Sequence, residues 1–168
     1  DYFPDKLYVW SQFWKKMIKL PIDDQYVVVD EFRYLNEQKS KFGHIKKKNN
    51  QLIVLSQGAI GNDIAEKFLE HYDIFKEYDI KYKLHPGEFD RWQNYPALKK
   101  LIEFDNVEIV KNEIPLYILF AESSLQIGVF STALYEGVEF GCDTLLLNIN
   151  GIEYMDRFIE LYGVEILK

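Results

Sequence analysis

The feature that most constrains the fold is a regular alternation of continuous apolar segments with helix-like segments, beginning near residue 51. The apolar segments read as five strands, "QLIVLS", "IKYKL", "VEIV", "LQIGVF" and "TLLLNI". The segments between them, such as "NDIAEKFLEHYDIFKEY", place apolar residues three and four positions apart, as amphipathic helices do, and a last helix is expected over 152–163. Strands without polar alternation that are joined by helices form a mostly parallel sheet covered on both faces. The sequence therefore predicts a Rossmann-like three-layer α/β/α domain.

A shorter front segment precedes this domain. Strand-like residues at 6–10 and 26–32 flank a helical stretch at 11–20, which predicts one β-α-β unit. The polar, lysine-rich run 36–51 then predicts a surface loop or linker, whose lysines could instead meet an anionic lipid or a phosphate. We divide the chain into a front segment with its basic linker, residues 1–50, and a Rossmann-like domain, residues 51–168. Because the chain opens at Asp1 without Met, we interpret it as a piece of a longer protein.

Composition excludes several classes of protein. The chain has 168 residues, room for one principal domain, and its 48% hydrophobic and 16% aromatic residues exclude global disorder. A formal net charge of −7 argues against a nucleic-acid-binding module, which needs surplus positive charge. Cys142 is the single cysteine, so no intrachain disulfide can form and a reducing compartment is the simplest interpretation. Neither an apolar run of about 18 residues nor a signal-peptide pattern occurs, so we expect a cytoplasmic protein.

Functional residues are expected where the strand order reverses. In a sheet of order 3-2-1-4-5 the reversal lies between the first and fourth strands, and ligands bind beyond their carboxyl ends. The loop "SQGAIGND" follows the first strand, and its Gly58 and Gly61 would let the backbone approach a ligand, although plain turn chemistry also explains them. This loop matches neither G-x-G-x-x-G nor a P-loop, which disfavours dinucleotide oxidoreductases and P-loop NTPases.

His85 follows the second strand and is itself followed by Pro86, which restricts its backbone. Its imidazole could donate to a phosphate oxygen, or it could be an ordinary structural hydrogen-bonding group. No second His or Cys stands at ligand spacing in the sequence, so we expect no zinc site.

The stretch "GVFSTALYEGVEFG" follows the fourth strand. Ser131 and Thr132 fall where the helix begins, so their hydroxyls and the following amides could hold a phosphate, or they could simply cap the helix. Glu136 lies one turn, about 5.4 Å, beyond Thr132 on the same face, which suits a carboxylate that accepts from ribose hydroxyls. Glu139 shares that face less closely. Ser131 is not in a G-x-S-x-G elbow, which disfavours a serine hydrolase.

Three runs, "SQGAIGND", "KYKLHPGEFDRW" and "FAESSLQIGVFSTALYEGVEFGC", resemble the C-terminal, nucleotide-sugar-binding half of a bacterial GT-B glycosyltransferase of capsular or other surface polysaccharide synthesis. The His-Pro pair is similar to the motif of bacterial sialyltransferases and polysialyltransferases, and to the Lys-x-His-Pro of CDP-glycerol glycerophosphotransferases. The resemblance covers roughly residues 51–156. It implies that the Rossmann-like domain is one half of a GT-B fold.

The resemblance also implies a role for each candidate residue. His85 would contact donor phosphate and, as the catalytic residue, stabilise charge on the leaving group in place of a metal. Ser131 and Thr132 would bind donor phosphate, and Glu136 would bind the ribose. The implied donor-nucleotide site consists of Gln57, Gly58, His85, Pro86, Ser131, Thr132 and Glu136. No metal ion is implied, and no cofactor apart from the donor substrate.

The implied reaction moves a sugar from a nucleotide-sugar donor to a polysaccharide or lipid-linked acceptor. It would take place in the cytoplasm, with a peripheral association at the inner face of the plasma membrane left open. GT-B catalysis occurs between two domains, so the resemblance implies a missing N-terminal acceptor domain and little or no turnover by these residues alone. Two alternatives stay open, namely a UDP-sugar 2-epimerase-like enzyme of the same architecture and a non-catalytic nucleotide-binding or scaffold module.

Overall fold

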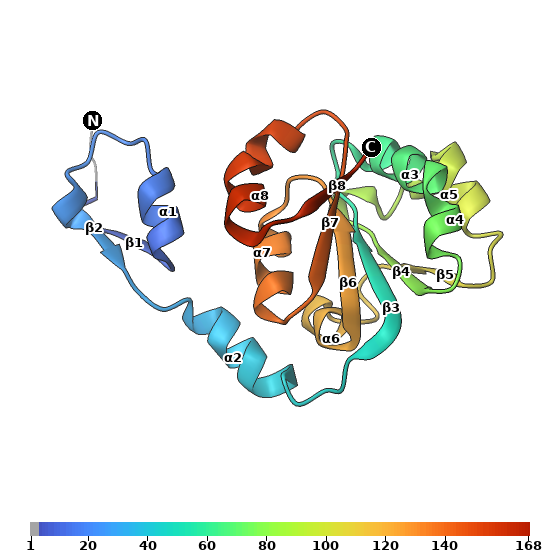
Figure 1. The fold of residues 1–168 in the computed structure, drawn as a ribbon, viewed down its shortest axis with the longest axis horizontal. Coiled ribbons are helices and arrows are strands. Elements are labelled where there is room, and N and C mark those ends of the chain that lie inside the picture. The colour runs from blue at the N-terminus through green and yellow to red at the C-terminus, as the bar shows by residue number, and fades with distance from the viewer. Residues whose placement is uncertain (1–3) are drawn as a thin grey trace. The chain divides into compact units, whose positions relative to one another are not determined.

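The computed structural model describes residues 4–168 and divides the chain into two compact units, one ending at residue 41 and one comprising residues 42–168 (Figure 1). The first unit contains β1 (Leu7–Val9), α1 (Gln12–Met17), the 3-10 helix η1 (Asp24–Tyr26) and β2 (Val27–Val29). β1 and β2 pair in parallel with Leu7 opposite Val27, which confirms the predicted β-α-β unit.

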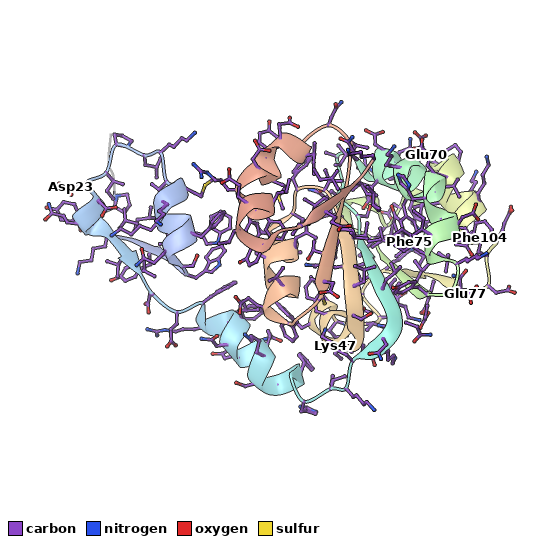
Figure 2. The ribbon with its side chains drawn as sticks, viewed as in Figure 1. Asp23, Lys47, Glu70, Phe75, Glu77 and Phe104 are labelled. Atoms are coloured by element: carbon purple, nitrogen blue, oxygen red, sulfur yellow. The ribbon has the colours of Figure 1, made fainter. Side chains whose placement is uncertain are left out.

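The predicted loop over 36–51 is wrong in most of its length. Residues 33–42 form α2 (Arg33–Phe42), and β3 already begins at Lys48. The physical reason is that this run is rich in Glu, Gln and Lys, which favour helix as readily as they favour solvent. Lys47, labelled in Figure 2, is not simply solvated either. Its Nζ donates to the carbonyls of Phe120 at 3.1 Å and Ser123 at 2.6 Å.

The second unit is built on a six-stranded, entirely parallel sheet in the order β5-β4-β3-β6-β7-β8. Its strands are β3 (Lys48–Leu55), β4 (Asp79–Lys83), β5 (Val107–Val110), β6 (Ser123–Gly128), β7 (Asp143–Leu147) and β8 (Glu165–Leu167). The first five confirm the predicted order 3-2-1-4-5. The sixth strand was not predicted, because it has only three residues and is defined by its pairing with β7 rather than by a pattern of its own.

Helices cover both faces of this sheet (Figure 1). They are α3 (Gly61–Glu70), α4 (Tyr72–Phe75), α5 (Pro96–Leu101), α6 (Leu116–Glu122), α7 (Thr132–Glu139) and α8 (Asp156–Tyr162), with the 3-10 helices η2 (Pro86–Glu88), η3 (Trp92–Asn94) and η4 (Ile152–Met155). Helices α3, α4 and α5 share one core with Leu52 and Val54 of β3, whereas α6, α7 and α8 share another with Ile53 and Leu55. This alternation along one buried strand confirms the three-layer α/β/α prediction.

A buried glutamine joins β6 to the helix that follows it. Gln126 is fully buried, and its Nε2 donates to the carbonyl of Leu134 and to Oγ1 of Thr144, both at 2.8 Å. A Cβ atom at Gly137 would overlap with Oε1 of Gln126, so glycine lets α7 approach the sheet closely. The start of α7, at the carboxyl end of β6, is thereby fixed. Within the described residues, no helix has the length and hydrophobicity needed to cross a membrane.

Candidate functional site

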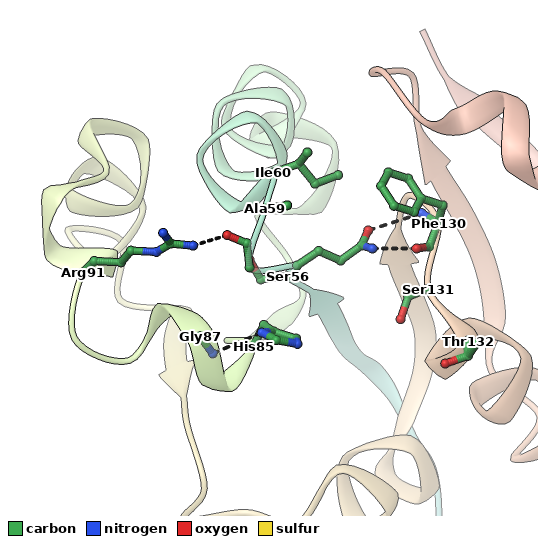
Figure 3. A pocket seen from close by; sticks show the side chains of 11 residues that line it. Ser56, Ala59, Ile60, His85, Gly87, Arg91, Phe130, Ser131 and Thr132 are labelled. Atoms are coloured by element: carbon green, nitrogen blue, oxygen red, sulfur yellow. Dashed lines mark hydrogen bonds between the residues drawn. The ribbon is translucent and has the colours of Figure 1, made fainter.

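A pocket of about 680 Å³ opens at the carboxyl ends of β3, β4 and β6 (Figure 3). β3 and β6 are neighbours in the sheet, but the chain after β3 enters a helix on one face and the chain after β6 enters a helix on the other. This divergence leaves a crevice at the strand ends, which is where α/β proteins bind ligands. The lining residues come from three loops and are Ser56, Gln57, Gly58, Ala59, Ile60, His85, Gly87, Arg91, Phe130, Ser131 and Thr132.

Five of the predicted site residues meet in this pocket, namely Gln57, Gly58, His85, Ser131 and Thr132. They come from positions as far apart as 57 and 132 in the sequence, and the sheet topology brings them to one edge. Pro86 and Glu136 are not among the described residues that line the pocket. Pro86 instead begins η2, where its fixed φ angle and missing N–H suit a first helical position.

His85 is an exposed residue held in one orientation by its own turn. The backbone N–H of Gly87 donates to Nδ1 of His85 at 3.1 Å. A ring nitrogen that accepts a hydrogen bond carries no proton in the neutral form, so the proton lies on Nε2. His85 therefore offers an Nε2–H donor on the edge of the ring away from Gly87, which is the group that a phosphate oxygen would need.

Two glycines border the imidazole of His85. A Cβ atom at Gly58 would stand 3.0 Å from Nδ1 of His85, and a Cβ atom at Gly87 would stand 3.3 Å from it. Both separations are tighter than ordinary van der Waals contact. A side chain at residue 58 or 87 would crowd the imidazole. This is a reason for glycine at both positions that goes beyond the formation of a turn.

Ser131 and Thr132 stand at the start of α7. Ser131 has an extended backbone, and its Oγ accepts from the N–H of Ala133 at 3.2 Å, which makes it the N-cap. The simpler interpretation of Ser131, as a helix cap, is therefore correct, and the same residue also lines the pocket. The first N–H groups of a helix have no partner within the helix and carry partial positive charge, so this end of α7 can attract an anion.

Gln57 bridges two walls of the pocket. Its Nε2 donates to the carbonyl of Phe130 at 2.6 Å, and its Oε1 accepts from the N–H of Phe130 at 3.3 Å (Figure 3). The amide thereby ties the loop after β3 to the loop after β6. In this arrangement Gln57 shapes the pocket rather than presenting a free amide to a ligand.

Glu136 lies one turn along α7 from the pocket. Its Oε2 accepts a hydrogen bond from the hydroxyl of Tyr117, which belongs to α6. Glu136 lies one turn beyond Thr132, as the sequence implied. The sequence does not reveal its partner Tyr117, which precedes it by 19 residues in the chain. The structure brings Glu136 close to the neighbouring helix and does not bring it into the pocket lining.

Two residues of the site were missed by sequence reasoning. Arg91 lines the pocket, and its guanidinium donates to the carbonyl of Gly58 (Figure 3). It adds a permanent positive charge to the pocket that His85, Ser131 and Thr132 also line. Glu88 is fully buried, and its Oε2 accepts from the N–H of His85 at 2.9 Å. Both lie within "HPGEFDRW", where the only available signal was their nearness to His85 in the sequence.

No protein-family model matches the sequence, and a comparison with curated protein sequences finds no match either. Among solved structures, the chain is similar to UDP-GlcNAc 2-epimerase from Methanocaldococcus jannaschii, with a TM-score of 0.62 and 13% identity over 97% of this chain and 51% of the epimerase. The same enzyme in complex with UDP-GlcNAc and UDP gives a TM-score of 0.61 at 13% identity over 97% of this chain and 50% of the enzyme.

The chain is also similar to the pneumococcal O-GlcNAc transferase GtfA in complex with UDP and GlcNAc, with a TM-score of 0.54 and 12% identity over 86% of this chain and 30% of the transferase. At such identities the likeness establishes the fold alone. The chain spans about half the length of the epimerase that it matches. Its second unit has the fold of one Rossmann-like half of a GT-B enzyme.

Proposed function

We propose that this chain is the donor-binding half of a glycosyltransferase that uses a nucleotide sugar in bacterial surface polysaccharide synthesis, capsular or lipopolysaccharide. The observation that carries the proposal is the meeting of His85, Ser131 and Thr132 in one pocket at the strand-order reversal. These residues supply an imidazole N–H, hydroxyls and a helix N-terminus, all of which suit a phosphate. Arg91 adds a cation to the same pocket.

In the proposed reaction the donor phosphates lie between His85 and the start of α7, and the ribose extends along α7 toward Glu136. The bond between the sugar anomeric carbon and the leaving phosphate breaks, and a polysaccharide or lipid-linked acceptor takes the sugar. Nε2–H of His85, the hydroxyls of Ser131 and Thr132 and the positive end of the α7 dipole would stabilise the negative charge that grows on the leaving phosphate. Loss of one such donor costs roughly 10²-fold in rate. The acceptor hydroxyl oxygen forms the new bond to the anomeric carbon and gives up its proton to a base, and both this base and the acceptor-binding site would come from a further N-terminal domain.

A UDP-sugar 2-epimerase-like enzyme is the second candidate. The observation that favours it is that the epimerase structure matches 97% of the chain, whereas the transferase matches 86%. Epimerisation also requires a group that removes a proton from the sugar, and no carboxylate occurs among the described residues that line the pocket, so this group, like the base of the transferase, would lie outside these residues. We rank the transferase first because the runs around His85 and Ser131 resemble those of bacterial glycosyltransferases. Product analysis with UDP-GlcNAc distinguishes them, since the epimerase alone yields the 2-epimer.

The first test is titration of the 168-residue chain with UDP, CDP and CMP while its thermal stability is measured. A ligand that binds the folded state at about 100 times its Kd adds about 2.7 kcal/mol to the free energy of unfolding. We expect at least one nucleotide to raise the melting temperature in this way. If none of the three does so, the scaffold alternative is favoured and the donor-binding proposal fails.

The second test is His85→Ala, with His44→Ala at an exposed position as the matched control. Removing a hydrogen bond to a charged phosphate costs about 1.5–3 kcal/mol, so we expect His85→Ala to weaken nucleotide binding roughly tenfold or more. His44→Ala should bind as the parent chain does. Isothermal titration calorimetry measures both values, and equal affinity of the two variants would contradict the role proposed for His85.

A further inference from the structure

We propose that Glu88 is the positioning residue that holds His85 in its donor-binding state, an inference that rests on the proposed function. Glu88 ends η2 and its side chain is completely buried. Glutamate is rarely buried completely, because loss of water costs free energy unless the carboxylate is well hydrogen-bonded. A buried carboxylate next to an exposed histidine therefore calls for a physical reason, and its contacts supply one.

The carboxylate of Glu88 joins two of the three loops that form the pocket. Its Oε2 accepts from the backbone N–H of His85 at 2.9 Å, in the loop after β4. Its Oε1 accepts from the hydroxyl of Ser56 at 2.9 Å, in the loop after β3. Each oxygen is thus committed to a different loop. Together with the bond from Arg91 to the carbonyl of Gly58, this side chain sets the separation of the two loops and so the place of the imidazole within the pocket.

The start of α3 is shaped to admit this carboxylate. A Cβ atom at Gly61, the first residue of α3, would overlap with Oε1 of Glu88. Glycine at this position lets the carboxylate lie against the first turn of a ten-residue helix, where the helix dipole favours negative charge. Any larger residue at position 61 would therefore exclude the Glu88 carboxylate from its present position.

The bond from His85 to Glu88 is one half of a reciprocal pair that also sets the imidazole. In the same turn, the N–H of Gly87 donates to Nδ1 of His85, so the two hydrogen bonds form a capping box. The bond to Nδ1 selects the tautomer that carries its proton on Nε2. If the acceptor at Glu88 is removed, the turn loses one of its two closures, and Nδ1 is no longer held as an acceptor. Glu88 therefore acts on the donor site through the orientation and tautomer of His85.

The test is Glu88→Met, which keeps an unbranched side chain of similar size and removes both acceptors. Nitrogen NMR of the imidazoles, at a pH well above their usual pKa of about 6.5, reports which ring nitrogen carries the proton. The His85 signal is assigned by its absence from His85→Gln. We expect a single Nε2–H tautomer in the parent chain and a mixture of tautomers in Glu88→Met. We also expect UDP to bind roughly tenfold more weakly to that variant.

Two further variants separate this role from plain stability. Glu77→Met makes the same change at an exposed glutamate just before β4, at the opposite end of that strand from His85, and should leave the tautomer and UDP binding unchanged. Glu88→Gln should restore both, because its amide oxygen can accept from His85 while its amide nitrogen donates to Ser56. If Glu88→Met does not fold, Glu88→Leu takes its place with the same expected changes, since leucine likewise offers no acceptor to His85 or Ser56.

The inference is overturned if the folded variant without the acceptor keeps the single Nε2–H tautomer and the parent affinity for UDP. It is also overturned if Glu88→Gln behaves as Glu88→Met does, because the effect would then not arise from hydrogen-bond acceptance. Failure of the parent chain to bind UDP, CDP or CMP is a different outcome. It removes the proposed function, whereas the tautomer measurement still decides whether Glu88 orients His85.

Discussion

At the residue scale, the position of the His85 imidazole in the pocket is set by the residues packed around it rather than by the His-Pro motif alone. The imidazole is held by the N–H of Gly87 and stands against Gly58, whose carbonyl is in turn held by Arg91. The loop after β3 thus helps to determine where the ring can lie. The position of His85, which is proposed to contact the phosphate, therefore depends on the glycine at residue 58.

The contact at Gly58 gives a sharp prediction. Because an added Cβ would stand 3.0 Å from Nδ1 of His85, we expect Gly58→Ala to displace the imidazole and weaken UDP binding several-fold. The backbone of Gly58 is not in the left-handed region, so alanine itself should be tolerated. Calorimetric titration of Gly58→Ala, His85→Ala and the double variant forms a double-mutant cycle. Once the ring is absent, Gly58→Ala should have no further effect; additive losses would show that Gly58 acts independently of His85.

Single residues were predictable where strand ends alone determine their place. His85, Ser131 and Thr132 lie two to four residues beyond the ends of β4 and β6, so the parallel sheet brings them to one edge whatever their side chains do. Glu88 and Arg91 could not be assigned in this way, because their roles arise from contacts with Ser56 and Gly58, about 30 residues earlier in the chain. Local spacing carries no information about such partners. The same holds for the bond between Glu136 and Tyr117.

At the scale of elements, the approach of α7 to β6 positions the helix N-terminus that the donor site uses. Gln126 fills the space under the helix and bonds to Leu134 and Thr144, and Gly137 leaves room for it. A larger residue at 137 would push α7 away from the sheet and shift Ser131 and Thr132 with it. The packing of this helix against the sheet therefore requires glycine at position 137.

This packing predicts the sign of a substitution. Gly→Ala within a helix is ordinarily stabilising by about 1 kcal/mol. At Gly137 we expect the reverse, a loss of about 1–3 kcal/mol in the free energy of unfolding, because the methyl group would overlap with Gln126. Urea denaturation followed by circular dichroism measures the change. In a Gln126→Ala background the overlapping atom is gone, so the added Gly137→Ala should cost nothing; an unchanged cost there would mean that another contact is responsible.

Elements were predictable where their own periodicity is strong. The five longer strands of the sheet and the helices between them follow from apolar patterns that each segment carries by itself. α2 was taken for a loop because its exposed, lysine-rich sequence satisfies both states, and Leu35 is its only buried side chain. β8 was missed because a three-residue edge strand exists through its ladder with β7. For β8 the deciding interaction is therefore tertiary, whereas for α2 it is the helix propensity of its own Glu, Gln and Lys residues.

At the scale of the whole molecule, tyrosines whose pKa is raised tie stability to alkaline pH. Burial raises the pKa of Tyr72, Tyr82, Tyr135 and Tyr162, most strongly for the fully buried Tyr82. The folded state then holds protons that the unfolded state releases near pH 10. These phenols therefore stabilise the fold fully below about pH 10, and their contribution is lost as the pH rises above it. Burial lowers the pKa of Lys83, which works in the opposite direction.

We accordingly expect the free energy of unfolding to fall steeply above about pH 10. Tyr82→Phe removes one titrating group from the core, so its slope against pH should be shallower than that of the parent chain by up to about 1.4 kcal/mol per pH unit. Urea midpoints measured at a series of alkaline pH values give both slopes. Identical slopes would show that Tyr82 ionises no differently in the folded and unfolded states.

The three loops at the strand ends are cross-linked by Gln57 with Phe130 and by Glu88 with Ser56. Such a cavity is assembled before any ligand arrives, so little flexibility is left to be frozen on association. Recognition would then work as a fixed template. A molecule whose negative groups are spaced differently from the imidazole and the start of α7 could not be accommodated by loop movement, and selectivity among anionic compounds would be a property of the empty protein.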